Sequence, residues 1–148
     1  IKEVTTMIRE IKNEDFDDVL RLISILEEKE YDREKMSRVY NRHLNDEDYH
    51  CFVYVLDKKV VGMISLLIKE TLHHCGKTGE IIELCVDPTY RNNSIGKKLL
   101  DYVEDKAIHL QLSELELSSN IKRKDAHRFY ERHQYNKDHF NFTKKINH

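Results

Sequence analysis

The sequence predicts an α+β fold in which helices flank a mixed central sheet. Some segments carry apolar residues at helical spacing, and others are short runs rich in β-branched and aromatic residues. In chain order these segments read strand, two helices, three strands, helix, strand, helix and strands, which favours a mixed sheet covered by helices. The chain has 148 residues, one proline and no evident linker. We therefore expect a single domain over residues 7–148, with residues 1–6 as a leader or an expression remnant.

The first half is expected to form a strand, two helices and a hairpin. Asn13 and Asp32 are suitable N-caps, because their side chains can accept hydrogen bonds from the first helical turn. The charged stretch Glu27–Glu30 separates the two helices, and Asp57-Lys58-Lys59 is expected as a tight turn between two strands. The predicted strands are residues 7–11, 52–56 and 60–68.

The second half is expected to alternate strands and helices. Lys69–Gly79 is predicted as a loop or a fraying strand end, and Glu80–Val86 as a buried strand. A helix follows from Ile95 to about residue 110, because its apolar residues recur at helical spacing. The remaining predicted elements are a strand at residues 114–118, a helix at 125–133 and a final strand pair within 135–146.

Composition excludes several classes of function. The formal net charge is −2, which gives no support to nucleic-acid binding. No apolar run approaches the roughly 20 residues of a membrane helix, and no secretory signal pattern opens the chain. Cys51, Cys75 and Cys85 are odd in number and lack metal-like spacing, so we expect reduced thiols in a cytoplasmic protein.

The most informative segment is Val86–Leu100. An apolar strand ends at Pro88, a short polar loop follows, and a helix begins directly after it. The first backbone N–H groups of a helix have no acceptor within the helix, and the helix dipole adds positive potential there. This arrangement favours an anion, most often a phosphate.

Arg91-x-x-Ser94-x-Gly96 resembles the pyrophosphate-binding signature of the GCN5-related N-acetyltransferases (GNAT). Ser94 departs from that signature, which has glycine there. Serine tolerates positive φ poorly, so the turn is expected to be adjusted or strained, or the hydroxyl to cap the helix or contact a phosphate. The resemblance implies that acetyl-coenzyme A is the cosubstrate and that its pyrophosphate binds Arg91, Asn92, Asn93, Ser94, Ile95, Gly96 and Lys97.

The same resemblance implies the GNAT (acyl-CoA N-acyltransferase) fold, in which a splayed fourth and fifth strand hold the coenzyme. Here these strands would be Glu80–Val86 and residues 114–118. The backbone of Leu84, Cys85 and Val86 would then pair with the pantetheine arm and donate a hydrogen bond to the developing oxyanion.

Acyl transfer to an amine requires a base for the ammonium and an acid for the departing thiolate. Glu80 is the predicted base, because a glutamate at the corresponding place serves in several family members. Glu83 is the alternative, although in an ideal strand it faces away from Glu80 unless a bulge intervenes. Tyr130 is the predicted acid, since residues 125–132 resemble the family's Ala-x-x-x-Tyr helix. Asn120 is a predicted polar contact to the coenzyme, with turn formation as its alternative role.

Two further stretches, residues 72–84 and 120–144, resemble the bacterial aminoalkylphosphonate N-acetyltransferases. The implied substrate is a small aminophosphonate, which needs cationic donors. The candidate substrate-binding residues are His73, His74, Glu80, Arg123 and Arg128. Each could instead be a solvated surface residue, which is the favoured interpretation for Arg123 and Arg128 taken singly. No metal ligand is predicted, although His73 and His74 with Glu80 could form a divalent metal site.

The expected activity is therefore direct acetylation of a small primary amine, without an acyl-enzyme, because no histidine is placed by sequence to activate Cys85. Alternatives are a polyamine, an aminoglycoside or a protein N-terminus as acceptor, or a non-catalytic acyl-CoA sensor. The expected partner is a small-molecule amine rather than nucleic acid or membrane, with a homodimer as an open alternative to a monomer.

Overall fold

The computed structural model describes residues 3–147, with Asn92 described by its backbone alone, and it divides into two compact units. The first unit ends at Glu116 and the second begins at Leu117. Residues 1–2 of the expected leader lie outside the described residues, and the first strand begins at Thr6. Across residues 3–147, no helix has the length and apolarity needed to cross a membrane.

Five strands form one sheet in the order β1-β2-β3-β4-β5. From β1 to β5 they span Thr6–Glu10, Tyr49–Leu56, Lys59–Thr71, Gly76–Val86 and Leu115–Leu117. The first four strands are antiparallel to their neighbours, and β5 runs parallel to β4. The mixed sheet predicted from the sequence is confirmed.

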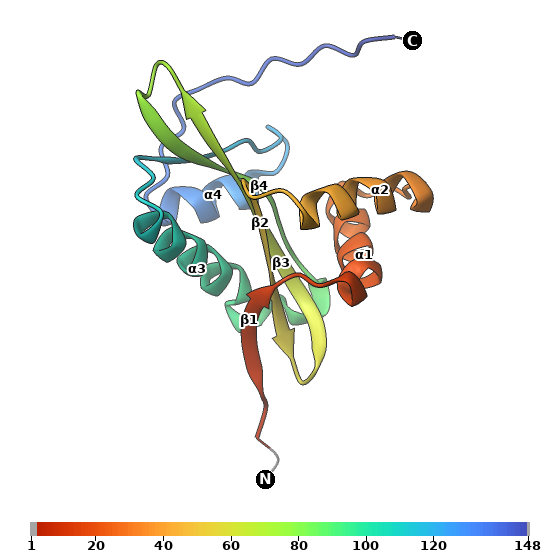
Figure 1. Cartoon of the computed structure of the whole chain (residues 1–148). Coiled ribbons are helices and arrows are strands. Elements are labelled where there is room, and N and C mark those ends of the chain that lie inside the picture. The colour runs from red at the N-terminus through yellow and green to blue at the C-terminus, as the bar shows by residue number, and fades with distance from the viewer. Residues whose placement is uncertain (1–2, 148) are drawn as a thin grey trace. The chain divides into compact units, whose positions relative to one another are not determined.

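Helices cover both faces of this sheet in the first unit (Figure 1). The 3₁₀ helix η1 (Asn13–Asp15) leads into α1 (Phe16–Glu27), which is followed by α2 (Arg33–Leu44). These two helices lie on one face, and α3 (Ile95–His109) lies on the other. Because both faces are covered, residues 51–55 and 60–66 are buried without alternation.

Each face has its own apolar core. Beneath α1, a cluster of buried side chains joins the helix to β2, β3 and β4: Val19, Leu22, Cys51, Val53, Val55, Val60, Met63 and Cys85. Beneath α3, Gly62 allows a close approach, because a Cβ there would lie 3.1 Å from Ile95 Cγ2 and 3.2 Å from Leu99 Cδ1. The two cores fix the position of β4 between its neighbours.

The predicted caps and turns hold in part. Asp32 caps α2, since its Oδ1 accepts a hydrogen bond from the Lys35 amide at 3.0 Å, and this prediction is confirmed. The Asn13 cap is wrong, because Asn13 begins η1 and α1 starts after Asp15. The turn between β2 and β3 is confirmed at Asp57 and Lys58, whose φ values of 47° and 67° suit a tight hairpin.

The loop or fraying strand end predicted at Lys69–Gly79 is too long, because only residues 72–75 form a turn. β3 runs to Thr71 and β4 begins at Gly76, and these two residues pair directly. Gly76 and Gly79 make this segment resemble a loop in the sequence, because glycine is uncommon inside strands. At Gly79, however, neighbouring leucines fill the space of a side chain, because a Cβ there would lie only 2.8 Å from Leu66 Cδ1.

The second unit contains α4 (Lys124–Arg132), close to the predicted helix. The final strand pair predicted within residues 135–146 is wrong, because no strand is formed between residues 118 and 147. Residues 136–147 are exposed, including Phe140 and Phe142. Residues that favour β-structure form a strand only where another strand pairs with them.

A buried ion pair fastens the entry to α1. Asp15 Oδ2 lies 2.7 Å from Arg9 Nη1 and accepts the Lys12 amide at 2.8 Å. Burial alone would raise the pKa of Asp15, but the hydrogen bonds from Arg9 and Lys12 outweigh it and lower the pKa. The resulting stabilisation is present above the unfolded pKa of about 4 and is lost as the pH falls through the lowered folded value.

We expect Asp15→Asn to lower the free energy of unfolding by about 2 kcal/mol at pH 7, because it leaves Arg9 half-paired in a buried site. Urea unfolding at pH 7 and pH 3 measures this, and the difference from the unsubstituted chain should shrink at pH 3. Asp17→Asn is the control, since Asp17 pairs with Arg33 on the exposed surface and should change stability by less than about 0.5 kcal/mol. If Asp15→Asn lowered the free energy of unfolding equally at both pH values, the stabilisation would not depend on ionised Asp15.

Candidate active site

The pairing of β3 and β4 shifts by one residue in the middle of the two strands. Ile64 pairs with Leu84, whereas Leu66 pairs with Ile81. Ser65 therefore lies opposite two residues of β4, which is the definition of a β-bulge.

The bulge brings Glu80 and Glu83 to the same face of the sheet. Glu80 pairs with Leu67, and the Glu83 side chain hydrogen-bonds Ser65, two residues earlier on β3. Alternate residues of a strand share a face, and Ser65 also pairs with Cys51 of the core beneath α1. Both carboxylates therefore belong to the α1 and α2 face, which the sequence allowed only if a bulge was present.

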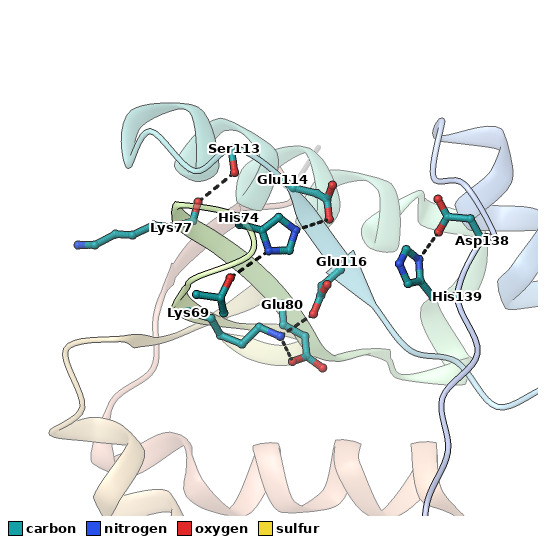
Figure 2. A network of polar contacts seen from close by, with 10 residues as sticks. Lys69, His74, Lys77, Glu80, Ser113, Glu114, Glu116, Asp138 and His139 are labelled. Carbon is teal, nitrogen blue, oxygen red and sulfur yellow. Dashed lines mark hydrogen bonds and ion pairs between the residues drawn. The ribbon is translucent and has the colours of Figure 1, made fainter.

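Glu80 shares a lysine with β5. Lys69 Nζ lies 3.2 Å from Glu80 Oε1 and 2.5 Å from Glu116 Oε1, so its ammonium bridges the two carboxylates (Figure 2). The hydrogen bond with Glu116, followed by that with Glu80, raises the pKa of Lys69. Lys69 was not among the site residues predicted from the sequence, because it lay in an expected loop. Had β3 been extended to Thr71, the alternation of its side chains would have placed Lys69 on the same face as Ser65 and Leu67.

The two predicted histidines lie in the turn between β3 and β4. His73 is exposed and His74 half-buried, with ring centroids 4.2 Å apart. His74 points toward Glu114, with Nε2 3.6 Å from the nearer carboxylate oxygen, and its Nδ1 is 3.0 Å from Thr71 Oγ1 (Figure 2). Across residues 3–147, no group of three or more His, Cys, Asp or Glu residues is arranged to hold a metal ion.

The end of β4 is anchored to α1. Asp87 is buried and accepts the Thr89 amide at 3.0 Å, which starts the 3₁₀ helix η2 (Pro88–Asn93). Arg21 Nη1 donates to the same carboxylate at 2.7 Å and Nη2 donates to the Val60 carbonyl at 3.0 Å. The hydrogen bond from Thr89, supported by Arg21, lowers the pKa of Asp87. The polar loop expected here is thus a short helix fixed at its first residue.

Ser94 occupies the left-handed region, with φ 56° and ψ 27°, between η2 and α3. Its carbonyl accepts the Lys98 amide at 3.1 Å, whereas its hydroxyl makes no capping hydrogen bond, so the cap considered from the sequence is not formed. The amides of Ile95, Gly96 and Lys97 come next and have no acceptor within the helix. The backbone therefore has the helix start that the sequence predicted, and its binding of an anion stays a prediction.

The side chains around this helix start are mostly at the surface. Arg91 and Asn93 are exposed. Lys97 Nζ is 2.7 Å from Asp101 Oδ2, one turn further along α3. The cationic side chains of Arg91 and Lys97 add to the positive potential of the amides, although Lys97 also forms an ion pair with Asp101.

β4 extends well beyond β5. Backbone hydrogen bonds join Lys77 to Ser113 and Gly79 to Glu114 at the start of this pairing, and β5 has 3 residues against 11 in β4. Leu84, Cys85 and Val86 lie in the part of β4 past these bonds. Pairing of their backbone with another extended chain, as predicted for the pantetheine arm, stays a prediction.

The second unit holds the remaining predicted residues around the start of α4. Asn120 Oδ1 accepts the Lys122 amide at 2.9 Å, which forms a turn, and Arg123 lies at the N-cap position of α4. Arg128 is exposed and forms an ion pair with Asp125. Asn120 thus forms a turn, and its contact with the coenzyme stays a prediction.

Tyr130 lies near the end of α4 within an aromatic cluster. Its ring centroid is 5.3 Å from that of Phe129 and 5.9 Å from that of Tyr135, both with edge-on geometry. The side chain is half-buried. Such edge-on contacts between aromatic rings stabilise the packing of Tyr130.

Comparison with known proteins identifies relatives. The profile of the acetyltransferase (GNAT) family matches residues 6–135. An aminoalkylphosphonate N-acetyltransferase from Salmonella typhimurium is 41% identical over 94% of this chain and 90% of the relative. A solved structure described as a transcriptional regulator from Bacillus halodurans has a TM-score of 0.89 at 19% identity, covering 96% of this chain and 100% of that one. A GNAT family acetyltransferase from Staphylococcus aureus has a TM-score of 0.80 at 18% identity, covering 95% and 98%. These structures support the fold implied by the Arg91–Gly96 motif.

The left-handed backbone of Ser94 makes a prediction for stability. Removing the Cβ relieves about 1 kcal/mol of steric cost, partly offset by the greater freedom of glycine in the unfolded chain. We expect Ser94→Gly to raise the free energy of unfolding by about 0.5 kcal/mol and Ser94→Val to lower it by more than about 1 kcal/mol. Urea unfolding measures both, with Asn93→Gly as a control that should lower stability. A lower free energy of unfolding in Ser94→Gly would show that Ser94 is not strained.

Proposed function

Because the chain belongs to the GNAT family of acetyltransferases, we propose that it transfers the acetyl group of acetyl-CoA directly to the primary amine of a small aminoalkylphosphonate. The observation that carries the choice of substrate is the 41% identity, over 94% of the chain, to a protein named for that activity. Free thiols at Cys51, Cys75 and Cys85 favour a reducing compartment such as a bacterial cytoplasm.

The coenzyme pyrophosphate binds, in this proposal, at the amides of Ile95, Gly96 and Lys97. Support comes from the left-handed Ser94, which turns the chain so that α3 starts with three amides that lack acceptors within the helix. Asp87 and Arg21 hold the preceding turn at a fixed place relative to β4. In this proposal the backbone of Leu84–Val86 pairs with the pantetheine arm and polarises the carbonyl.

Acetyl-CoA supplies the thioester, and the residues of this chain manage the protons. Glu80 is the proposed base that removes a proton from the acceptor ammonium, with Glu83 as the alternative on the same face. Lys69 holds the Glu80 carboxylate in place, and the same ammonium also forms an ion pair with Glu116. Tyr130 is the proposed acid, donating its hydroxyl proton to the departing thiolate.

The phosphonate requires cationic or neutral donors. His73 and His74 at the hairpin turn and Arg123 and Arg128 at α4 are the candidates. Arg128 is already paired with Asp125, so a phosphonate would compete with that carboxylate. We propose no metal ion in this recognition.

A second candidate acceptor is a small amine without a phosphonate, such as a polyamine. The observation in its favour is a group of ion pairs around β4 and β5, in which Glu80 and Glu116 share Lys69 and Glu114 pairs with His74. Within these pairs three carboxylates meet one lysine and one histidine. An excess of carboxylates favours cationic acceptors over anionic ones.

An acceptor panel with detection of released thiol distinguishes these candidates. We expect turnover with aminomethylphosphonate and 2-aminoethylphosphonate at a kcat/KM at least about tenfold above that for propylamine or spermidine, because a bound phosphonate adds charge-assisted hydrogen bonds. Preference for spermidine would favour the second candidate. No thiol release with any amine would contradict acetyl transfer to small molecules.

We expect Glu80→Gln and Tyr130→Phe each to lower kcat by about 100-fold or more, because each removes a proton-transfer group. Coenzyme A should bind both variants as it binds the unsubstituted chain, as calorimetry would measure. Glu70→Gln removes the same charge from an exposed residue of β3 and should leave kcat unchanged. Full activity in both substituted enzymes would rule out these two roles, whereas loss of turnover with normal binding would exclude a non-catalytic sensor.

A further inference from the structure

A pocket of about 180 Å³ lies between α1, α2, β2 and β4 in the first unit. It is comparable in size to a cavity of about 150 Å³ that admits benzene. Most of its lining is apolar or aromatic, with Phe16, Tyr31, Tyr40, His43 and Tyr49 as the ring-bearing residues. Among the lining residues that the structure describes, Glu83 alone carries a carboxylate.

Ser65 holds the Glu83 carboxylate at the wall of this pocket. The Ser65 side chain is fully buried. Its Oγ accepts the backbone N–H of Glu83 at 3.0 Å and donates to Glu83 Oε1. The Ser65 hydroxyl therefore accepts a hydrogen bond from the Glu83 amide, which the bulge displaces from regular pairing, and fixes the direction of the Glu83 side chain.

The basic residues beside this pocket contact its rings: Arg33 Cζ lies 5.0 Å from the centroid of Phe16, and Lys29 Nζ lies 4.7 Å from that of Tyr31. No lysine or arginine occurs among the described residues that line the pocket. Burial, with smaller contributions from Cys51 and Glu83, raises the pKa of Tyr49, so its hydroxyl is neutral. A carboxylate among neutral and aromatic groups gains most from a cation that the ligand brings.

Aromatic rings favour the same ligand chemistry. Tyr49 stacks on His43 at a centroid distance of 3.7 Å, and Phe16 packs on Tyr40 at 5.2 Å. The faces of such rings attract cations, as Arg33 over Phe16 shows, and the carbon atoms of an alkylammonium group also fit an apolar lining. An anionic phosphonate, in contrast, would meet Glu83 with the same sign of charge.

We propose that this pocket receives the ammonium-bearing end of the acceptor, with Glu83 as the residue that contacts it and Ser65 as a positioning residue that holds Glu83. The inference rests on the proposed acetyl transfer and adds a specificity determinant to it. Glu80 lies on the same face of β4, so an amine held by Glu83 is on the side of the sheet where its proton is removed. The phosphonate then extends away from the pocket.

Binding and kinetics of Glu83→Gln test the contact. Titration calorimetry with propylammonium chloride probes the pocket without acetyl-CoA. We expect Glu83→Gln to weaken this binding, and to raise KM for the amine acceptor, by about tenfold or more. Because Glu80 is the proposed base, kcat should change less than about threefold; a fall in kcat of about 100-fold would instead make Glu83 the base and overturn its assignment to binding. Glu70→Gln, which removes an exposed charge from β3, should alter neither value by more than about twofold.

Ser65 is tested by removal and rescue. Ser65→Ala should raise the acceptor KM by about threefold to tenfold, and Ser65→Thr, which keeps the hydroxyl, should restore most of the loss. A general folding defect would lower the amount of active enzyme and so kcat, without this split between KM and kcat. If Ser65→Ala does not fold, Glu83→Asp, which keeps the charge but moves it away from Ser65, is expected to show the same rise in KM.

The outcomes separate this inference from the proposed function. Acetyl transfer with an unchanged KM in Glu83→Gln would overturn the pocket assignment and leave the acetyltransferase activity standing. Propylammonium binding that depends on Glu83, in a chain that acetylates no amine, would support the pocket and overturn the proposed activity. No binding of propylammonium to the unsubstituted chain would also overturn the pocket assignment.

Discussion

One extra residue in β4 determines which side chains can act together. Ser65 lies opposite Ile82 and Glu83, and its hydroxyl bonds both the displaced amide and the carboxylate of Glu83. With regular alternation, Glu83 would face the core beneath α3, where Phe52 and Leu99 are fully buried and a carboxylate would lose its hydration. The bulge therefore joins two carboxylates on one face and keeps the other face apolar.

The same strand also sets the position of the helix start. β4 leads directly into Asp87, whose carboxylate begins η2 and is held by Arg21 of α1. Ser94 then reverses the chain into α3 with a left-handed backbone. A proposed acceptor face and a proposed diphosphate site thus depend on one strand and the turn that follows it, and rigid supports of this kind favour precise positioning of reacting groups.

Features encoded by neighbouring residues could be predicted from the sequence, whereas features that depend on pairing could not. Asp32 caps its helix and Asp57-Lys58 forms its turn because each acts on the adjacent backbone. The bulge is a mismatch between two strands, so Glu80 and Glu83 could be placed only conditionally. Lys69 was hidden because strand pairing, rather than composition, carries β3 through the predicted loop to Thr71. The expected C-terminal strands failed for the same reason, since strand propensity near Phe140 has no effect without a paired strand.

A crystal structure of the chain with coenzyme A and a non-reacting amine acceptor most directly tests the importance of the bulge. We expect the pyrophosphate at the amides of Ile95–Lys97 and the amine nitrogen about 3 Å from a carboxylate oxygen of Glu80 or Glu83 on the α1 and α2 face. A complex with the amine on the α3 face, or distant from both carboxylates, would contradict the role assigned to the bulge.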